Sequence, residues 1–143
     1  MRAMRTSTDF ERDRDLIIVT GAVTGPAGRA SCRMIVDTGC AITMLTPELA
    51  GTIGYGSRDS LRGSTVSAPG GVVPGFFVVI LELVALGFLV ENVLVNVGEF
   101  DVTSHRRRDD LEADALLGLT FLDYFNYEIR SYESRILVER ADE

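Results

Sequence analysis

The sequence predicts a mainly β fold. Short runs of Val, Ile, Leu and Phe recur along the chain between turns rich in glycine and proline. Only two short segments, one after residue 46 and one after residue 118, have the pattern of a helix. The chain of 143 residues, with 46% hydrophobic and 24% charged residues, is long enough for one domain with its own core. We therefore expect residues 1–14 to form a flexible N-terminal tail and residues 15–143 to form a single domain.

The domain is expected to begin with a hairpin. Residues 15–23 and 29–37 are predicted strands, and residues 24–28 between them contain the proline and glycines of a turn. One helical turn follows, with Thr46 as its N-cap and Pro47 at its first position.

The middle of the chain predicts three strands and a polar connection. Two strands flank a turn at residues 67–71, and a third begins after Gly87. Residues 98–114 are charged, with His105 followed by three arginines and then by acids, so we expect a solvated loop there and no anion site.

The last third of the chain predicts a short apolar strand, a helix and two closing strands. The segment "ALLGLTFLDYFNYEI" leads from the strand through Gly118 into a helix that we expect Thr120 to cap. Phe121, Leu122 and Phe125 share one face of that helix and are expected in the core. Two strands with a turn at residues 132–134 then end the chain.

Composition excludes several classes of function. A net charge of −7 argues against a nucleic-acid partner. Residues 1–15 lack the apolar core of a signal peptide, and the run from Phe76 to Val90 is too short to span a bilayer. We expect a cytoplasmic protein without a membrane partner. Cys32 and Cys40 are expected to be free thiols, and one histidine without a Cys-x-x-Cys pair argues against a metal site.

Asp37 is the residue that raises the question of function. It follows the apolar run Met34-Ile35-Val36, and an acid at the end of a buried strand is costly unless it has a partner or a use. A phosphatase would need a second acid where Gly39 stands, and an actin-like ATPase would need two α/β domains. An acid that only caps its own turn is the structural alternative.

The segments "IVDTGCAITML" and "ALLGLTFLDYFNYEI" together resemble the retropepsin-like aspartic proteases, which are single-domain enzymes with viral, bacterial and eukaryotic cellular members. The resemblance covers about residues 16–138. It implies a closed acid-protease-type β-barrel with one short helix near the C-terminus, and a symmetric homodimer. The sequence contains one Asp-Thr-Gly, so the second carboxylate is expected from a second copy of the chain.

The resemblance also implies roles for individual residues. Asp37, Thr38 and Gly39 would be the catalytic loop, with both Asp37 carboxylates holding one water that attacks a protein or peptide substrate, and with no cofactor. Leu117 and Gly118 would support this loop from below. Cys40 stands where the family usually has Ala or Ser, and we expect it to act as a small buried filler beside the site.

A hairpin tip that covers the substrate is the last feature that the resemblance implies. Its substrate-binding residues would be Ser67, Ala68, Pro69, Gly70, Gly71 and Val72. The function expected on these grounds is peptide-bond hydrolysis by an aspartic endopeptidase. The alternative is a dimerisation or peptide-binding module with the same fold and little or no turnover, because a fold does not by itself guarantee chemistry.

Overall fold

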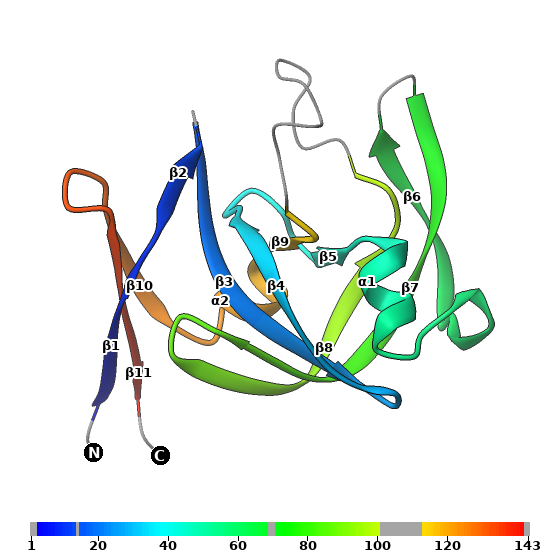
Figure 1. Cartoon of the computed structure of the whole chain (residues 1–143), viewed down its shortest axis with the longest axis horizontal. Helices are drawn as coiled ribbons and strands as arrows, with labels where there is room; N and C mark the ends of the chain where they lie inside the picture. The colour runs from blue at the N-terminus through cyan, green and yellow to red at the C-terminus, as the bar shows by residue number, and fades with distance from the viewer. Residues whose placement is uncertain (1–2, 14, 69–70, 101–112, 142–143) are drawn as a thin grey trace.

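The computed structural model of the chain describes residues 3–13, 15–68, 71–100 and 113–141, and most of this part is strand (Figure 1). The elements are β1 (Ala3–Asp9), β2 (Glu11–Asp13), β3 (Leu16–Gly25), β4 (Gly28–Val36), β5 (Thr43–Leu45), α1 (Pro47–Thr52), η1 (Ser57–Asp59), β6 (Arg62–Ala68), β7 (Gly71–Ala85), β8 (Phe88–Val97), β9 (Ala115–Leu117), α2 (Leu119–Leu122), β10 (Asn126–Arg130) and β11 (Arg135–Ala141). The prediction of a mainly β fold is confirmed. Within these ranges, no helix combines the length and the apolar character needed to span a lipid bilayer.

The larger of two sheets has eight strands in the order β2-β3-β4-β9-β5-β8-β7-β6. The pairs β4–β9 and β5–β8 are parallel, and the other neighbours are antiparallel. β3 also pairs with β7, with Ala22 opposite Val84, so the sheet curls back on itself. β2 and β6 are its two ends among the strands described. The structure therefore shows a sheet that the β3–β7 pairing joins back on itself, and the closed barrel implied by the family resemblance stays a prediction.

The local predictions for the first half of the domain are confirmed. β3 and β4 form a hairpin whose last pair is Gly25 with Gly28. The helix α1 begins at Pro47, and the hydroxyl oxygen of Thr46 accepts a hydrogen bond from the Leu49 N–H at 3.3 Å. These signals are local in the chain, since a cap and a turn depend on residues a few positions apart.

The smaller sheet, in the order β1-β11-β10, joins the two ends of the described chain. β1 pairs with β11 over seven residues, and Phe10 is buried with its N–H bonded to the Ser134 carbonyl oxygen at 3.0 Å. The expectation of a flexible tail over residues 1–14 is therefore wrong for residues 3–13. The polar sequence of these residues does not predict a strand, because the strand forms only by pairing with β11, which lies more than 100 residues further along the chain.

The segment after β9 differs from the prediction in one detail. Gly118, not Thr120, stands immediately before α2, so Thr120 lies inside the helix and the predicted cap is wrong. Phe121, Leu122 and Phe125 are buried, as expected. The ring centroids of Phe121 and Phe125 lie 5.0 Å apart, within an aromatic group that anchors α2 in the core.

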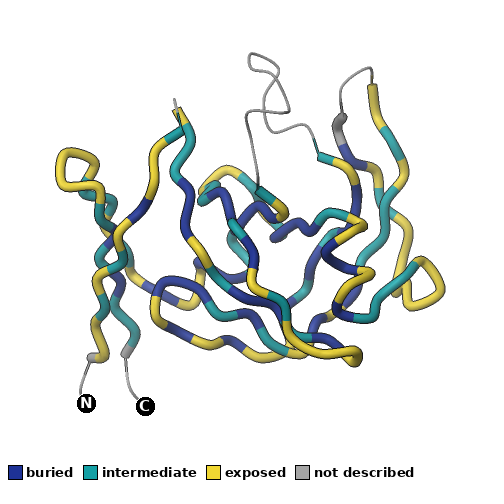
Figure 2. The backbone as a smooth tube through the Cα atoms, viewed as in Figure 1, coloured by how far each residue is buried: buried dark blue, intermediate teal, exposed yellow. Residues whose placement is uncertain are grey.

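Buried residues gather where the large sheet curls (Figure 2). Most belong to one cluster that includes α2 and the inner faces of β7 and β8. A second apolar cluster draws one residue from each of β3, β4, β5, β6 and β9, and its members are Ile18, Ile35, Met44, Val66 and Leu116. The predicted loop residue His105 and the hairpin residues Pro69 and Gly70 lie outside the described residues. Of Ser67 and Ala68 only the backbone is described.

Candidate active site

Asp37 begins the loop between β4 and β5, and its backbone is held from a distant part of the chain. β4 and β9 run parallel with Val36 opposite Leu117, so the next amide, that of Asp37, donates to the Leu117 carbonyl oxygen at 3.0 Å. The loop then turns tightly, since the Cys40 N–H donates to the Asp37 carbonyl oxygen at 3.2 Å. The carboxylate oxygen Oδ1 accepts the Gly39 N–H at 2.9 Å. This contact fixes the direction of the Asp37 side chain.

The loop is open to solvent at its tip. Asp37 is half-buried, whereas Thr38, Gly39 and Ala41 are exposed. A Cβ built on Gly39 would lie 3.4 Å from Oδ1 of Asp37, which is ordinary contact. The contacts of the described chain therefore place only a weak steric requirement for glycine at this position.

Cys40 is a free thiol at the base of this loop. Its S–H donates to the Ile42 carbonyl oxygen at 3.0 Å, and its own carbonyl oxygen accepts the Leu119 N–H at 2.8 Å. Burial, and then the nearby Asp37 carboxylate, raise the pKa of the Cys40 thiol. A protonated thiol is a poor nucleophile.

Leu117 and Gly118 lie directly beneath the loop. Leu117 is fully buried, and Gly118 is pressed against the backbone of Cys40. A Cβ on Gly118 would stand 2.5 Å from the Cys40 carbonyl oxygen and 3.1 Å from the Thr43 nitrogen. The structure thus brings Asp37, Cys40, Leu117 and Gly118 together, although the two segments lie far apart in sequence.

Two threonines that the sequence analysis did not place at the site complete this contact. Thr43 is fully buried, and its hydroxyl oxygen accepts the Gly118 N–H at 3.0 Å. The Thr43 N–H in turn donates to the hydroxyl oxygen of Thr120 at 3.0 Å. In the sequence, Thr43 is a single hydroxyl residue between the apolar residues Ile42 and Met44. That pattern alone does not predict a buried hydrogen bond.

A cavity of about 270 Å³ opens beside Asp37 between the ends of β3, β4 and β9. Five of the seven residues that line it are apolar, and Asp15 is the second carboxylate there; the lining residues are Asp15, Leu16, Ile17, Ile35, Val36, Asp37 and Leu116. Ile35 and Leu116 also belong to the second apolar cluster. Within the described ranges, no group of three or more His, Cys, Asp or Glu side chains is arranged to hold a metal ion.

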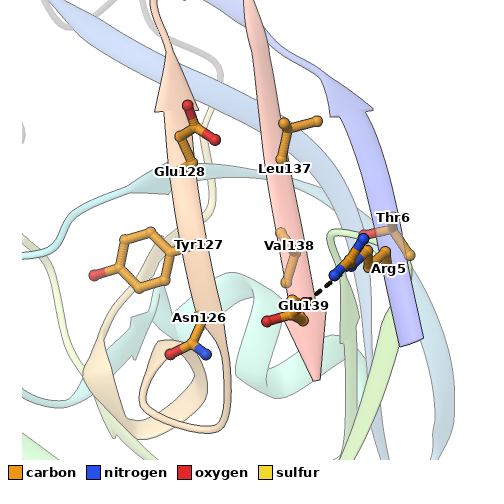
Figure 3. Close-up of a pocket in the computed structure, with 8 residues that line it drawn as sticks. All are labelled: Arg5, Thr6, Asn126, Tyr127, Glu128, Leu137, Val138 and Glu139. Carbon is orange, nitrogen blue, oxygen red and sulfur yellow. Dashed lines mark hydrogen bonds and ion pairs between the residues drawn. The ribbon is translucent and has the colours of Figure 1, made fainter. Parts of the chain in front are cut away.

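A larger cavity, of about 390 Å³, lies across the small sheet (Figure 3). It contains the ion pair between Arg5 Nε and Glu139 Oε2, at 2.9 Å, and the exposed edge of Tyr127. No residue of the Asp37 loop lines it. The smaller cavity is the better candidate because it holds the loop aspartate.

The hairpin expected to cover the substrate is formed by β6 and β7. Ser67 pairs with Val72 and Ala68 with Gly71, and Val72 is 68% exposed. Below the tip, Val66 is buried in the second apolar cluster and Val73 packs against it. The part of the hairpin next to its tip therefore belongs to a cluster with apolar side chains from the strands that carry and support Asp37.

The chain is similar in sequence to a family described as aspartyl protease, over residues 19–121. No curated protein matches it. Among solved structures, it resembles a retropepsin-like aspartic protease from Rickettsia conorii, with a TM-score of 0.67 and 18% sequence identity. That match covers 97% of this chain and 94% of the other. At this identity the likeness concerns the fold.

Proposed function

The chain belongs to the aspartyl protease family and has a retropepsin-like fold, and from this premise we propose that it is an aspartic endopeptidase active as a homodimer. The observation that carries the proposal is the placement of Asp37. Its carboxylate stands on a solvent-facing loop whose backbone is bonded to Leu117 from below and whose side chain is bonded to Gly39.

The chemistry requires two carboxylates that share a proton. Two such groups a few ångströms apart cannot both ionise, so one polarises the scissile carbonyl while the other takes a proton from the attacking water. Asp15 lines the same cavity as Asp37, but Leu16 and Ile17 follow it instead of a Thr-Gly turn. The second carboxylate in our proposal is Asp37 of another subunit, related by a two-fold axis that passes between the loops.

The exposed loop residues suit that arrangement. Thr38 and Gly39 stand at the open tip of the loop, where a second subunit has access to them. We assign Thr38 to hydrogen bonding across the axis, and Gly39 to leaving room for the partner's loop. Leu117, Gly118 and Cys40 support the loop from inside the subunit.

Substrate recognition is assigned to the cavity beside Asp37 and to the β6–β7 hairpin. An extended peptide adds to strand edges through backbone hydrogen bonds, and its side chains then enter pockets between the strands. Ile35 and Leu116 of the second apolar cluster line the Asp37 cavity, and Val66 of the same cluster belongs to the hairpin. Apolar substrate side chains are expected near the scissile bond. The hairpin tip at residues 67–72 would exclude water during the reaction.

The experiment is cleavage of a diverse peptide library, from about pH 4 to 7.5, read by mass spectrometry. Wild type is compared with Asp37→Asn and with the matched control Asp9→Asn, which changes an exposed aspartate on β1. Cleavage by wild type and the control, but not by Asp37→Asn, supports the proposal. If all three proteins leave the library intact while remaining folded, the peptide-binding module without turnover becomes the better description.

A further inference from the structure

Four hydrogen bonds hold the Asp37 loop and the residue that follows it against β9 and the start of α2. The first is the bond from the Asp37 N–H to the Leu117 carbonyl oxygen, and the second runs from the Leu119 N–H to the Cys40 carbonyl oxygen. The third, at the end of the loop, is the Thr43 N–H, which donates to the side chain of Thr120. The fourth runs from the Gly118 N–H to the Thr43 hydroxyl oxygen, and all four lie between 2.8 and 3.0 Å.

We propose that Thr120 is a positioning residue for the proposed reaction, because its hydroxyl oxygen fixes the C-terminal end of the Asp37 loop through Thr43. The catalytic part of this inference, that Thr120 affects turnover, rests on the proposed function. Its structural part, that Thr120 holds the loop in place, stands on the observed contacts alone.

Thr120 and Thr43 each contribute a hydroxyl oxygen to these bonds, whereas Leu117 and Cys40 contribute backbone oxygens. Any residue at those two positions would supply a carbonyl oxygen. Thr120 uses a side-chain oxygen, so the third bond depends on the identity of the residue. Thr43 is fully buried, and its amide has little access to water if this acceptor is lost.

The helix that carries Thr120 is itself immobilised in the core. Phe121 and Leu122, the next two residues of α2, are fully buried, and the aromatic ring of Phe125 packs against Phe121. The hydroxyl oxygen of Thr120 is therefore presented from a rigid support. Side chains that orient a reacting group work best when their own position is fixed in this way.

A shift at the Thr43 end would reach the Asp37 carboxylate through a short length of chain. The carboxylate is held within the same loop, by the Gly39 N–H, and this contact moves with the loop. Two carboxylates that share one water need closely matched positions, and a displacement of about 1 Å can lower a rate by about 100-fold. Loss of the Thr120 contact should thus affect turnover more than substrate binding.

The test compares Thr120→Val, which removes the acceptor while keeping the shape, with Thr120→Ser, which keeps the hydroxyl. Thr52→Val is the matched control, since the Thr52 hydroxyl donates to the Glu48 carbonyl oxygen on the exposed side of α1. We measure kcat and KM on a peptide that wild type cleaves, together with amide hydrogen exchange over residues 37–43. If Thr120→Val does not fold, Thr120→Ala removes the same acceptor without placing a methyl group against the Thr43 amide.

We expect Thr120→Val to lower kcat by about 10-fold or more with KM within about twofold, to speed exchange over residues 37–43, and Thr120→Ser to restore both. Thr52→Val should behave as wild type. A folded Thr120→Val protein with wild-type kcat overturns the positioning role and leaves the proposed function standing. If wild type cleaves no peptide, the proposed function fails, and unchanged exchange over residues 37–43 would then overturn the structural part of the inference as well.

Discussion

Gly118 and Cys40 are in direct backbone contact: a Cβ added to Gly118 would come within 2.5 Å of the Cys40 carbonyl oxygen. The glycine has a φ of −109°, which any residue adopts, so the requirement for glycine is steric and not conformational. The two residues lie on the two segments that meet at the candidate site. Their separation therefore sets how closely the Asp37 loop can sit on the segment that supports it.

Gly118→Ala should destabilise the protein by about 1–3 kcal/mol, because a backbone oxygen has to move to admit the methyl group. Gly51→Ala is the control, since a Cβ on Gly51 in α1 would meet nothing within 4 Å. Alanine in a helix is favoured over glycine by about 0.5–1 kcal/mol, so this variant should be slightly more stable than wild type. Thermal unfolding of both variants measures the difference, and equal melting temperatures would contradict the steric reading.

Mixing wild type with Asp37→Asn tests whether two subunits share one site. If subunits exchange freely, a wild-type subunit in a ninefold excess of the variant finds a wild-type partner about one time in ten, so activity per wild-type subunit should fall to about a tenth. Activity is measured at fixed total protein after equilibration, with Asp9→Asn replacing Asp37→Asn as the control mixture. Activity that stays proportional to the amount of wild type would indicate a site within one chain.

Phe10→Ala should cost about 3 kcal/mol of stability, because Phe10 is 8% exposed between the two sheets and its loss leaves a cavity. Tyr132→Ala removes an aromatic side chain that is fully exposed at the β10–β11 turn, and it should change stability by less than about 0.5 kcal/mol. Urea unfolding gives both values. A small effect for Phe10→Ala would mean that the N-terminal strand adds little to the fold.

Stability should fall above about pH 9, in part because of Cys32. Burial, with a smaller contribution from the Asp114 carboxylate, raises the pKa of the Cys32 thiol from 9.0 to about 12. Below pH 9 the thiol is protonated in both the folded and the unfolded chain. Between pH 9 and 12 the Cys32 thiol loses its proton mainly in the unfolded chain. The free energy of unfolding therefore decreases as pH rises through this range.

Cys32→Ala removes this effect, and its free energy of unfolding should decline less steeply than that of wild type, by about 1.4 kcal/mol per pH unit above pH 9. The comparison uses urea unfolding at several pH values between 8 and 11. Any loss of packing in the variant is the same at every pH and cancels when slopes are compared. Identical slopes would show that Cys32 ionises as readily in the folded chain as in the unfolded one.

The features that the sequence predicts well are local or belong to the family motif. The α1 cap at Thr46, the β3–β4 turn and the buried face of Phe121, Leu122 and Phe125 each depend on residues close together in the chain. The resemblance to the retropepsin-like family is also confirmed. It was carried by residues around Asp37 and Gly118.

The features that the sequence missed depend on partners far along the chain. Residues 3–9 look like a polar tail, and only the pairing with β11 makes them a strand. In the sequence, Thr120 has the pattern of a helix cap. In the structure, its hydroxyl oxygen accepts the N–H of Thr43, the first residue of β5 after the Asp37 loop. A short polar side chain has several local uses, and its tertiary partner decides between them.

The parallel pairing of β4 with β9 also has a consequence for the order in which the chain is made and folds. Asp37 is made before Leu117, whose carbonyl oxygen accepts the hydrogen bond from the Asp37 amide. Contacts between such distant segments form late in folding, because the long intervening chain must first be brought together. A chain that has been made only as far as Asp37 lacks the Leu117 carbonyl oxygen that holds the Asp37 amide in place. The activity proposed for Asp37 would therefore begin only after the segment that carries Leu117 has been made and has paired with β4.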